Sequence, residues 1–576
     1  MTMKKITYSI LLITLTVIYG CKQDFLDKVP QGELSPVQVE TQEGVEGLLV
    51  GAYGLLNGNV NGTWGNYASA PSQWLFGEVA SDNAHKGSTG SDQPNMNLIE
   101  SHQPTSTNDN LSVMWRNYYE GIQRCNSTLR TLVAVQESEE RFSDERSVQI
   151  QGEARLLRAH YYFLLRRLFA RIPYIDENIP VTEAAVQPND SDVYPQIVAD
   201  LRFAVDNLTA TKYNNEVGRV DRIIAQAYLG KVLLYLGEYD EALTLFNAVI
   251  ASRPAITGLN YWDNFDLDTE NGPEAIFSVQ HAISPDGGGD NANVGDMLSG
   301  LYGTSPVGCC GFYQPTIDLV NAYKVDTNGL PYLDNSYRNN PYLSDLGLSG
   351  SAKTNYSLNT SLRFDPRLDY NVGRRGVQYL DYGVMPGDPW IRDPAYAGPF
   401  IIIKTMVPQS KFASHTVAGA AYITALDVNL IRLSDVILMA AECNIELGNL
   451  GEALRLVNLV RQRAANIPHK TLDGTEGGTP AADYQIGLYP SFPNAEYART
   501  ALRFERRLEL AFEGHRFYDL VRWGVAEQVV SSYSSFEGSI LEAYRGISFA
   551  PRNAYYPLPQ DQIDQSRGTL QQDPNY

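Results

Sequence analysis

The chain has 576 residues, of which 43% are hydrophobic and 19% charged, so it can bury a large core and is not intrinsically disordered. Lys and Arg total 45 against 66 Asp and Glu, which gives a net charge of −21. This acidic balance argues against a nucleic-acid-binding protein, which needs a basic surface, and against adhesion to anionic lipid through a polybasic patch.

The N-terminus predicts a lipoprotein signal peptide. Two lysines precede an apolar stretch from Ile6 to Tyr19, which ends at Gly20-Cys21. A basic start followed by an apolar stretch of this length is typical of secretion and is too short for a membrane-spanning helix. The residues before Cys21 resemble a bacterial lipoprotein processing site. We expect residues 1–20 to be removed and Cys21 to be acylated, with ordinary secretion and cleavage nearby as the alternative.

The first irregular segment covers residues 57–110. It is rich in Gly, Asn, Ser and Thr, and it holds Trp64, Tyr67 and Trp74. A segment of this length is too long for a passive connection, and long loops on a rigid scaffold usually carry function. Disorder is the alternative, but the interleaved aromatic residues favour a packed surface.

The clearest pattern is a helical repeat of the tetratricopeptide type over residues 220–254. Gly230 and Ala242 are small where two helices are expected to cross closely, and Phe246 is expected to fill the gap between them. Pro254 ends the second helix. A weaker pair of helices precedes this unit, over residues 151–208.

The second irregular segment covers residues 258–425 and contains much of the remaining Gly and Pro. Cys309-Cys310 lies in it between two glycines, and a disulfide between the adjacent residues and a pair of free thiols are both open. A zinc site is disfavoured because no paired Cys or His spacing accompanies them. Cys125 and Cys443, in contrast, fall in helical patterns and are expected to be buried.

Two helical segments follow, over residues 430–465 and 498–523, and the first of them repeats the tetratricopeptide spacing. Repeat units cannot bury their faces alone and must stack, so the chain between the two clear units must fold back onto the stack. We therefore expect residues 21–576 to form one mainly α-helical body. In this fold class, tetratricopeptide-type repeats carry large loop and short-strand insertions that form a ligand face.

Charged residues near the end of the chain recur at steps of three or four. They are Glu509, Glu513, Arg516, Asp519 and Arg522, and we expect them on one helix. Opposite charges at this spacing can pair on a helix face. Salt links that hold the last helices to the stack explain the spacing, and an acid–base pair for catalysis is the sharper alternative.

Seven stretches, taken in order, carry a resemblance to a known family: Cys21 to Asp27, Trp115 to Asn126, Glu153 to Phe163, Arg432 to Glu442, Glu505 to Trp523, Tyr556 to Pro559, and Gln572 to Tyr576. Together they resemble the SusD/RagB family of outer-membrane nutrient-binding lipoproteins over essentially the whole mature chain. Each stretch alone is a weak match, but their order is highly specific.

The resemblance implies a tetratricopeptide scaffold with an irregular ligand face. It implies a lipid-anchored protein on the outside of a Gram-negative cell, which covers a TonB-dependent barrel of the SusC type. Such a protein captures an oligosaccharide, or in some members a peptide, and passes it inward. The family is not known for catalysis, and no cofactor is implied.

The resemblance also implies a ligand site built from loops that correspond here to residues 57–110 and 282–400. A sugar needs flat apolar rings against its ring hydrogens and fixed polar groups for its hydroxyls. The candidate ligand contacts are Trp64, Tyr67 and Trp74 for stacking, Asp82, Asn83 and His85 as polar partners, and Tyr302, Phe312, Tyr313 and Trp390 from the second segment. Local core packing is the alternative for each ring. If all the rings faced inward with no hollow between the two segments, this interpretation would fail.

Three other functions stay open. The ligand could be a peptide, for which the acidic charge favours a basic or neutral sequence. An extracytoplasmic glycosidase is a weaker alternative, because no catalytic motif is evident although carboxylates are plentiful. A repeat scaffold without a ligand would predict that mutation of Trp64 and Tyr67 changes only stability. His85 has no partner at metal-ligand spacing, so a metal role is disfavoured.

Overall fold

The computed structural model describes residues 39–60, 66–418 and 422–576. The predicted signal peptide, the acylation site at Cys21 and the candidate ligand residue Trp64 lie outside the described residues. Among the described residues, no helix is both long and apolar enough to cross a membrane.

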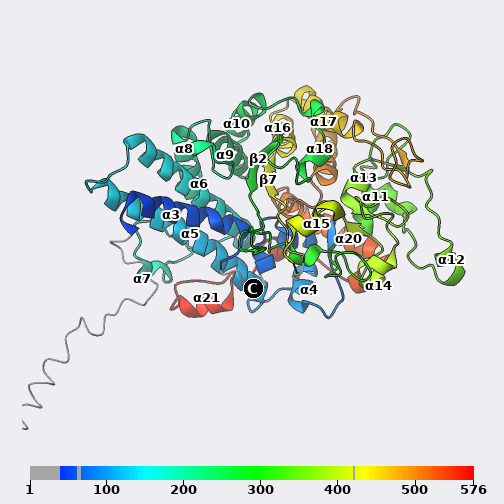
Figure 1. Ribbon diagram of the computed structural model, residues 1–576, viewed down its shortest axis with the longest axis horizontal. Helices are drawn as coiled ribbons and strands as arrows, with labels where there is room; N and C mark the ends of the chain where they lie inside the picture. The colour runs from blue at the N-terminus through cyan, green and yellow to red at the C-terminus, as the bar shows by residue number, and fades with distance from the viewer. Residues whose placement is uncertain (1–38, 61–65, 419–421) are drawn as a thin grey trace, which may run out of the picture.

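Long helices build the scaffold (Figure 1): α3 (Gln42–Gly54), α5 (Asp109–Gln136), α6 (Asp144–Phe169), α8 (Tyr194–Asn207), α9 (Arg222–Leu236), α10 (Tyr239–Ala251), α16 (Leu433–Glu446), α17 (Leu450–Ala465), α18 (Ala495–Glu509) and α20 (Ala526–Ile540). Short helices lie between and around them: α4 (Pro94–Glu100), α7 (Val181–Ala184), α11 (Ile317–Ala322), α12 (Gly350–Thr354), α13 (Leu368–Asn371), α14 (Pro394–Ala397), α15 (Gln409–His415), α19 (Arg516–Arg522) and α21 (Gln560–Gln565).

The strands form two-stranded sheets. Three sheets are antiparallel: β1 (Ala84–Gly87) with β3 (Phe312–Pro315), β2 (Ala275–Val279) with β7 (Val428–Arg432), and β5 (Val372–Gly373) with β6 (Ile401–Ile402). The fourth, β4 (Arg363–Phe364) with β8 (Asp483–Tyr484), is parallel. The sheet of β1 and β3 joins the two irregular segments, β5 and β6 pair within the second, and β2–β7 and β4–β8 connect the second segment to residues after it.

The helices form one continuous array. Helices α3, α5, α6 and α8 gather at one end of the molecule, and α9, α10, α16, α17 and α18 continue across its upper edge (Figure 1). Helix α10 packs against α16, so the repeat units over residues 220–254 and 430–465 are neighbours. Their first helices end in the same way, because Gly237 and Gly448 both take left-handed conformations, with φ of 78° and 81°.

The predicted close crossing within the first repeat is confirmed. Gly230 of α9 lies against the ring of Phe246 in α10, and a Cβ atom on Gly230 would come within 2.6 Å of that ring. Ala242 and Phe246 are fully buried. The missing side chain at Gly230 is therefore what allows α9 and α10 to approach each other.

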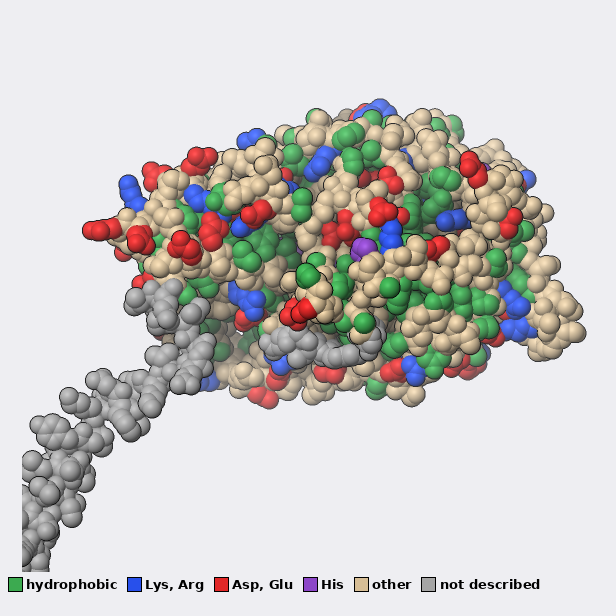
Figure 2. All heavy atoms as spheres, viewed as in Figure 1, with side chains coloured by type: hydrophobic (Ala, Val, Ile, Leu, Met, Phe, Trp, Pro, Cys, Tyr) green, Lys and Arg blue, Asp and Glu red, His purple; other side chains and the backbone are tan. Residues whose placement is uncertain are grey.

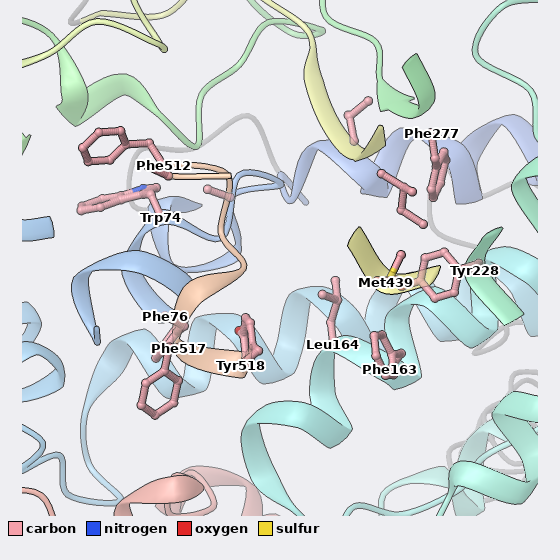
Figure 3. Packing of buried hydrophobic residues seen from close by; sticks show 14 of the residues in the cluster. Trp74, Phe76, Phe163, Leu164, Tyr228, Phe277, Met439, Phe512, Phe517 and Tyr518 are labelled. Atoms are coloured by element: carbon pink, nitrogen blue, oxygen red, sulfur yellow. The ribbon is translucent and has the colours of Figure 1, made fainter. Parts of the chain in front are cut away.

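The core is mainly one large cluster of buried apolar residues that runs from Val45 to Leu570. Figure 3 shows part of it, where Phe163 and Leu164 of α6 lie near Tyr228 of α9. A smaller cluster lies within the second irregular segment, between Leu301 and Leu426. The described parts of both irregular segments are thus packed, as their aromatic content indicated.

The charged residues near the chain end do not share one helix, so that prediction is wrong. Helix α18 ends at Glu509 and α19 begins at Arg516. Gly514 interrupts the helical path with φ of 76°, and a Cβ atom there would lie 2.2 Å from the carbonyl oxygen of Ser72. The turn is thus required by a close approach of two backbone segments.

These charges nevertheless pair, mostly with residues of opposite charge elsewhere in the chain. Glu509 is fully buried and accepts hydrogen bonds from Arg432 at 2.7 Å, from Arg367 at 2.9 Å, and from Arg463. Arg432 also binds Glu274 at 2.7 Å. Burial opposes the charged form of Glu509, but the three guanidinium groups hold its pKa well below the usual value.

We expect Gly230→Ala to destabilise the protein by about 1–3 kcal/mol, because the new methyl group would push Phe246 out of its position between α9 and α10. Gly51→Ala is the matched control. Gly51 also lies within a helix, α3, but a Cβ atom there would meet nothing within 4 Å. This control should gain about 0.5–1 kcal/mol from helix propensity. Urea unfolding of both variants checks the difference in sign.

We expect Arg432→Met to cost about 3–5 kcal/mol in urea unfolding, because it removes one guanidinium partner from each of the buried carboxylates of Glu274 and Glu509. The control is Arg202→Met, which removes an ion pair with Glu241 whose side chains are 50% and 42% exposed. That pair should contribute less than about 1 kcal/mol. Equal losses in the two variants would show that the buried network is not a principal source of stability.

Candidate ligand-binding face

The sheet of β1 and β3 joins the two irregular segments. Ala84 pairs with Pro315, His85 with Gln314, and Gly87 with Phe312. All residues of both strands are buried, so both faces of this small sheet are covered. The sheet and the backbone bonds at its ends bring residues 83–88 beside residues 311–316.

Asp82 and Asn83 lie just before β1 and are directed into the protein. The carboxylate of Asp82 is 2.7 Å from Arg516 and 3.1 Å from Arg507. Burial opposes its charge, but these two arginines hold the pKa of Asp82 well below its usual value. Asn83 donates to Glu78 at 2.8 Å and accepts from Arg507 at 3.0 Å. Their hydrogen-bonding groups are thus occupied by protein partners.

His85 is completely buried between two carboxylates. Its Nδ1 lies 3.1 Å from Glu100 and its Nε2 lies 2.9 Å from Glu537, and its ring stacks on Tyr544 at 3.9 Å. Burial lowers the pKa of His85, but the two carboxylates more than offset this and raise it to about 9. His85 is therefore an interior cation that links β1 to α4 and α20.

Four of the candidate rings belong to the core. Trp74 lies 5.5 Å from Tyr313, and Tyr313 lies 5.5 Å from Phe512; Figure 3 shows Trp74 beside Phe512. Phe312 is 2% exposed, and Trp390 is 7% exposed in the smaller cluster.

The prediction of ligand contact is therefore corrected for seven residues: Trp74, Asp82, Asn83, His85, Phe312, Tyr313 and Trp390. The physical reason is the same for all of them. Packing of the two irregular segments against the scaffold removes aromatic area from water and encloses the polar groups beside it.

Tyr302 is half-buried, and contacts with Trp390, Arg392 and Gly311 fix its position. Its backbone N–H donates to the carbonyl of Trp390 at 3.3 Å. The guanidinium of Arg392 lies 5.0 Å from the centre of its ring. Gly311 provides the space beside it, because a Cβ atom there would come within 3.1 Å of the Tyr302 Cβ. One face of Tyr302 is thus covered by an arginine, as in a cation–π pair.

Arg392 connects Tyr302 to the first irregular segment. Its Nη1 donates to Asp92 at 2.6 Å and to Ser88 at 2.8 Å. Ser88 in turn donates to Asp92 at 2.9 Å. The side chains of Arg392 and Asp92 are each 30% exposed, so this polar cluster borders solvent.

Tyr67 is the second half-buried candidate. Burial raises its pKa, as do the nearby carboxylates of Asp109 and Asp92, while a hydrogen bond with Gln93 opposes the shift. Asp92 therefore lies near both Tyr67 and the Arg392 cluster. We call Tyr67, Asp92, Gln93, Tyr302 and Arg392 the tyrosine face.

The loop of Cys309-Cys310 lies next to the tyrosine face. The two cysteines are joined by a disulfide and are partly exposed, so of the two open alternatives the structure shows the disulfide. The backbone N–H groups of Cys310 and Gly311 both donate to the carbonyl of Gly300, at 2.9 and 2.8 Å. These bonds close the loop that carries Tyr302.

An open hollow of about 530 Å³ lies between the end of α3, the loop over residues 216–219 and strand β2. The first segment contributes Asn57, and the second contributes Ser278, Gln280 and Asn291; Val217 also lines the hollow. Its lining is mainly apolar and includes the charged residues Glu216 and Arg219, and none of the candidate rings among the described residues lines it. In Figure 2 acidic and basic side chains are interspersed on the face drawn, without a continuous basic area.

Within the described residues, no cluster of three or more His, Cys, Asp or Glu side chains is arranged to hold a metal ion. Glu78 shows why isolated carboxylates here do not suggest catalysis. Burial raises its pKa to about 7, but it is fully enclosed and accepts hydrogen bonds from the backbone of Gly514 and His515.

The sequence profile described as "SusD family" matches residues 273–576, more than half of the chain. The chain belongs to the SusD family. A second profile, described as "Starch-binding associating with outer membrane", matches residues 24–234. The resemblance inferred from the ordered motifs is thus confirmed.

Individual SusD relatives are similar to this protein over about nine tenths of its chain. SusD-like protein P25 of Formosa agariphila is 23% identical over 542 residues, covering 90% of each chain. The structure of a SusD homolog from Bacteroides thetaiotaomicron has a TM-score of 0.68 at 20% identity and covers 94% of this chain and 99% of that one. Surface glycan-binding protein A from the same species, in complex with laminarihexaose, has a TM-score of 0.64 at 20% identity and covers 93% and 100%. These likenesses confirm the predicted helical fold class.

Sequence reasoning missed part of the tyrosine face of this SusD-family protein. Asp92, Gln93 and Arg392 were not singled out, because each is an ordinary polar residue in a loop. A weak signal was present, since Arg392 follows closely on Trp390 within an aromatic, proline-rich stretch. Only the tertiary contacts of Arg392, with Ser88, Asp92 and the ring of Tyr302, show that these loops meet.

We expect the His85 cation to make stability depend on pH. Its folded-state pKa of about 9 exceeds the ~6.5 of an unfolded histidine, so its contribution is complete below pH ~6.5 and is lost as the pH rises through about 9. Between pH 6 and 9.5, wild type should lose up to about 3 kcal/mol of unfolding free energy relative to His85→Asn.

Urea unfolding at several pH values measures this difference. The pKa of Lys86 is lowered by burial to about 8, so it titrates in the same window, but it is present in both proteins and cancels in the comparison. Parallel stability curves for the two proteins would contradict a charged His85.

Proposed function

We propose that this SusD-family protein binds a neutral oligosaccharide at the tyrosine face and delivers it to a TonB-dependent outer-membrane transporter of the SusC type. The observation that carries the binding proposal is the arrangement of Tyr67 and Tyr302. They come from the two irregular segments and both remain partly exposed; Tyr67 lies near Asp92, and Tyr302 is connected to Asp92 through Arg392.

The chemistry of the tyrosine face suits a sugar. A tyrosine ring covers the apolar face of a pyranose and offers a hydroxyl at its edge. Arg392, Asp92 and Gln93 supply donors and acceptors beside the rings. Because Arg392 and Asp92 already hold each other at 2.6 Å, little side-chain freedom is lost when a ligand binds.

A β-glucan is the first ligand to test. Surface glycan-binding protein A, whose fold this chain shares, is described in complex with laminarihexaose. Another structure of the same fold is described as a laminarin-binding SusD-like protein. Both are at most 23% identical to this chain, so they suggest a ligand class to test and not a particular linkage.

We propose an outer-membrane location with lipid attachment through Cys21. The signal-peptide pattern and the profile described as associating with the outer membrane support it. Acyl chains contribute about 0.8 kcal/mol per buried methylene, so more than one chain would hold the protein lastingly.

We propose binding without catalysis. Glycoside hydrolysis uses two carboxylates that flank the bond to be cleaved. Near the tyrosine face, Asp92 is held by Arg392 and Ser88, and Asp109 accepts a hydrogen bond from Asn95 at 2.9 Å. The two carboxylates are therefore engaged by protein donors.

The test is calorimetric titration with laminarin, laminarihexaose, a panel of other neutral glycans and a panel of basic and neutral peptides. Tyr67→Ala and Tyr302→Ala should each weaken binding of the responding glycan about tenfold, or roughly 1.4 kcal/mol. Tyr239→Ala is the matched control, because Tyr239 is also half-exposed but starts α10 in the helical scaffold. It should leave binding unchanged.

Three results would count against the proposal. Tight peptide binding without any glycan response would show that the ligand is a peptide and not an oligosaccharide. A double variant of Tyr67 and Tyr302 that loses stability but keeps full affinity would remove the tyrosine face as the site, and Gln280→Ala would then test the hollow. Hydrolysis of a bound glycan by the purified protein would contradict the proposal of binding without catalysis.

A further inference from the structure

A basic trough lies between α18 and α20, and neither the tyrosine face nor the proposed function uses it. Its cavity has a volume of about 250 Å³. One wall is a single face of α18, with Thr500, Arg503, Phe504 and Arg507 at helical spacing. The other walls come from α19, α20 and the short turn η9 (Ser336–Asn339).

The trough has more positive than negative charge. Arg338, Arg507 and Arg516 share the carboxylates of Asp82 and Asp318, at 2.6 to 3.1 Å. Arg503 also lines the trough, and among the described residues it forms no ion pair. Four guanidinium groups thus face two carboxylates, an excess of two positive charges in a chain whose net charge is −21.

The carboxylates beyond the trough do not neutralise Arg503. Glu442 and Glu446 act on it electrostatically, but Glu442 is bound by Arg522 at 2.6 Å and Glu446 by Arg499 at 2.6 Å. Burial lowers the pKa of Arg503. Arg503 thus keeps a positive charge that no carboxylate of the described residues balances by direct contact.

Several donors in the trough are unused. Arg503 donates no hydrogen bond to any described residue, and its guanidinium lies 5.0 Å from the centre of the Trp523 ring. Arg338 donates through Nε and Nη1, and Arg516 through Nε and Nη2, which leaves Nη2 of Arg338 and Nη1 of Arg516 without an acceptor among the described residues. Guanidinium groups recognise carboxylate, sulfate and phosphate oxygens with paired N–H donors.

We propose that this trough binds an oxyanion group, a carboxylate, sulfate ester or phosphate, through Arg503 with Arg338 and Arg516. A cavity of this size holds one charged sugar unit or a free phosphate. The trough is independent of the tyrosine face. A neutral glycan can therefore bind at the tyrosine face whether or not the trough binds an oxyanion.

The experiment titrates the full mature protein with galacturonic acid, glucose 6-sulfate and inorganic phosphate, and with glucose as the neutral control. Trp523 lies under Arg503, so its fluorescence should change on binding of an anion. Each anion that binds should also raise the melting temperature, by an amount that grows with the logarithm of its concentration above Kd. The three anions distinguish a charged sugar from free phosphate as the source of the oxyanion.

Arg503→Gln should weaken anion binding at least tenfold and remove the anion-dependent rise in melting temperature, while Arg503→Lys should retain part of both. Arg202→Gln, which replaces an exposed arginine on the scaffold, should change neither. Unchanged anion affinity in Arg503→Gln, equal binding of glucose, or no anion binding by wild type would overturn the proposal. Because Arg503 makes no hydrogen bond to the described protein, its replacement should not impair folding.

Discussion

One buried carboxylate connects the helical scaffold to the irregular segments. Glu509 closes α18 and binds Arg463 of α17, Arg432 where β7 meets α16, and Arg367 of the second irregular segment. Because none of these guanidinium groups has access to water, each depends on the shared carboxylates for its charge balance. Long segments without regular structure are thereby held in fixed positions against the stacked helices.

The short sheet of β1 and β3 extends this constraint to the surface. It joins the two irregular segments and encloses His85 between two carboxylates. Tyr302 and Asp92 lie in the loops before β3 and after β1, and Arg392 contacts both of them. The proposed binding surface on loops is therefore held by interior charges, which for the proposed function would reduce the ordering cost of ligand capture.

The repeat units were predictable because their signal is local. The spacing of Gly230, Ala242 and Phe246 places small and large residues on facing turns of adjacent helices, and the structure shows that contact. The break at Gly514 was not predictable from spacing, because the charged residues from Glu509 to Arg522 recur at helical intervals. The helix is interrupted because the backbone of Ser72, from a distant segment, lies against Gly514. The candidate face was predicted only in part, with Tyr67 and Tyr302 on the surface and most other rings inside.

By itself, the sequence determined the acidic character, the secretion pattern, the helical repeat and the family, because each of these depends on composition or on residues close together in the chain. Tertiary structure alone decided which aromatic and polar side chains face solvent. Aromatic density indicates that a segment packs but carries no information on the direction of each ring. That direction depends on partners hundreds of residues away, such as Phe512 for Tyr313 and Glu537 for His85.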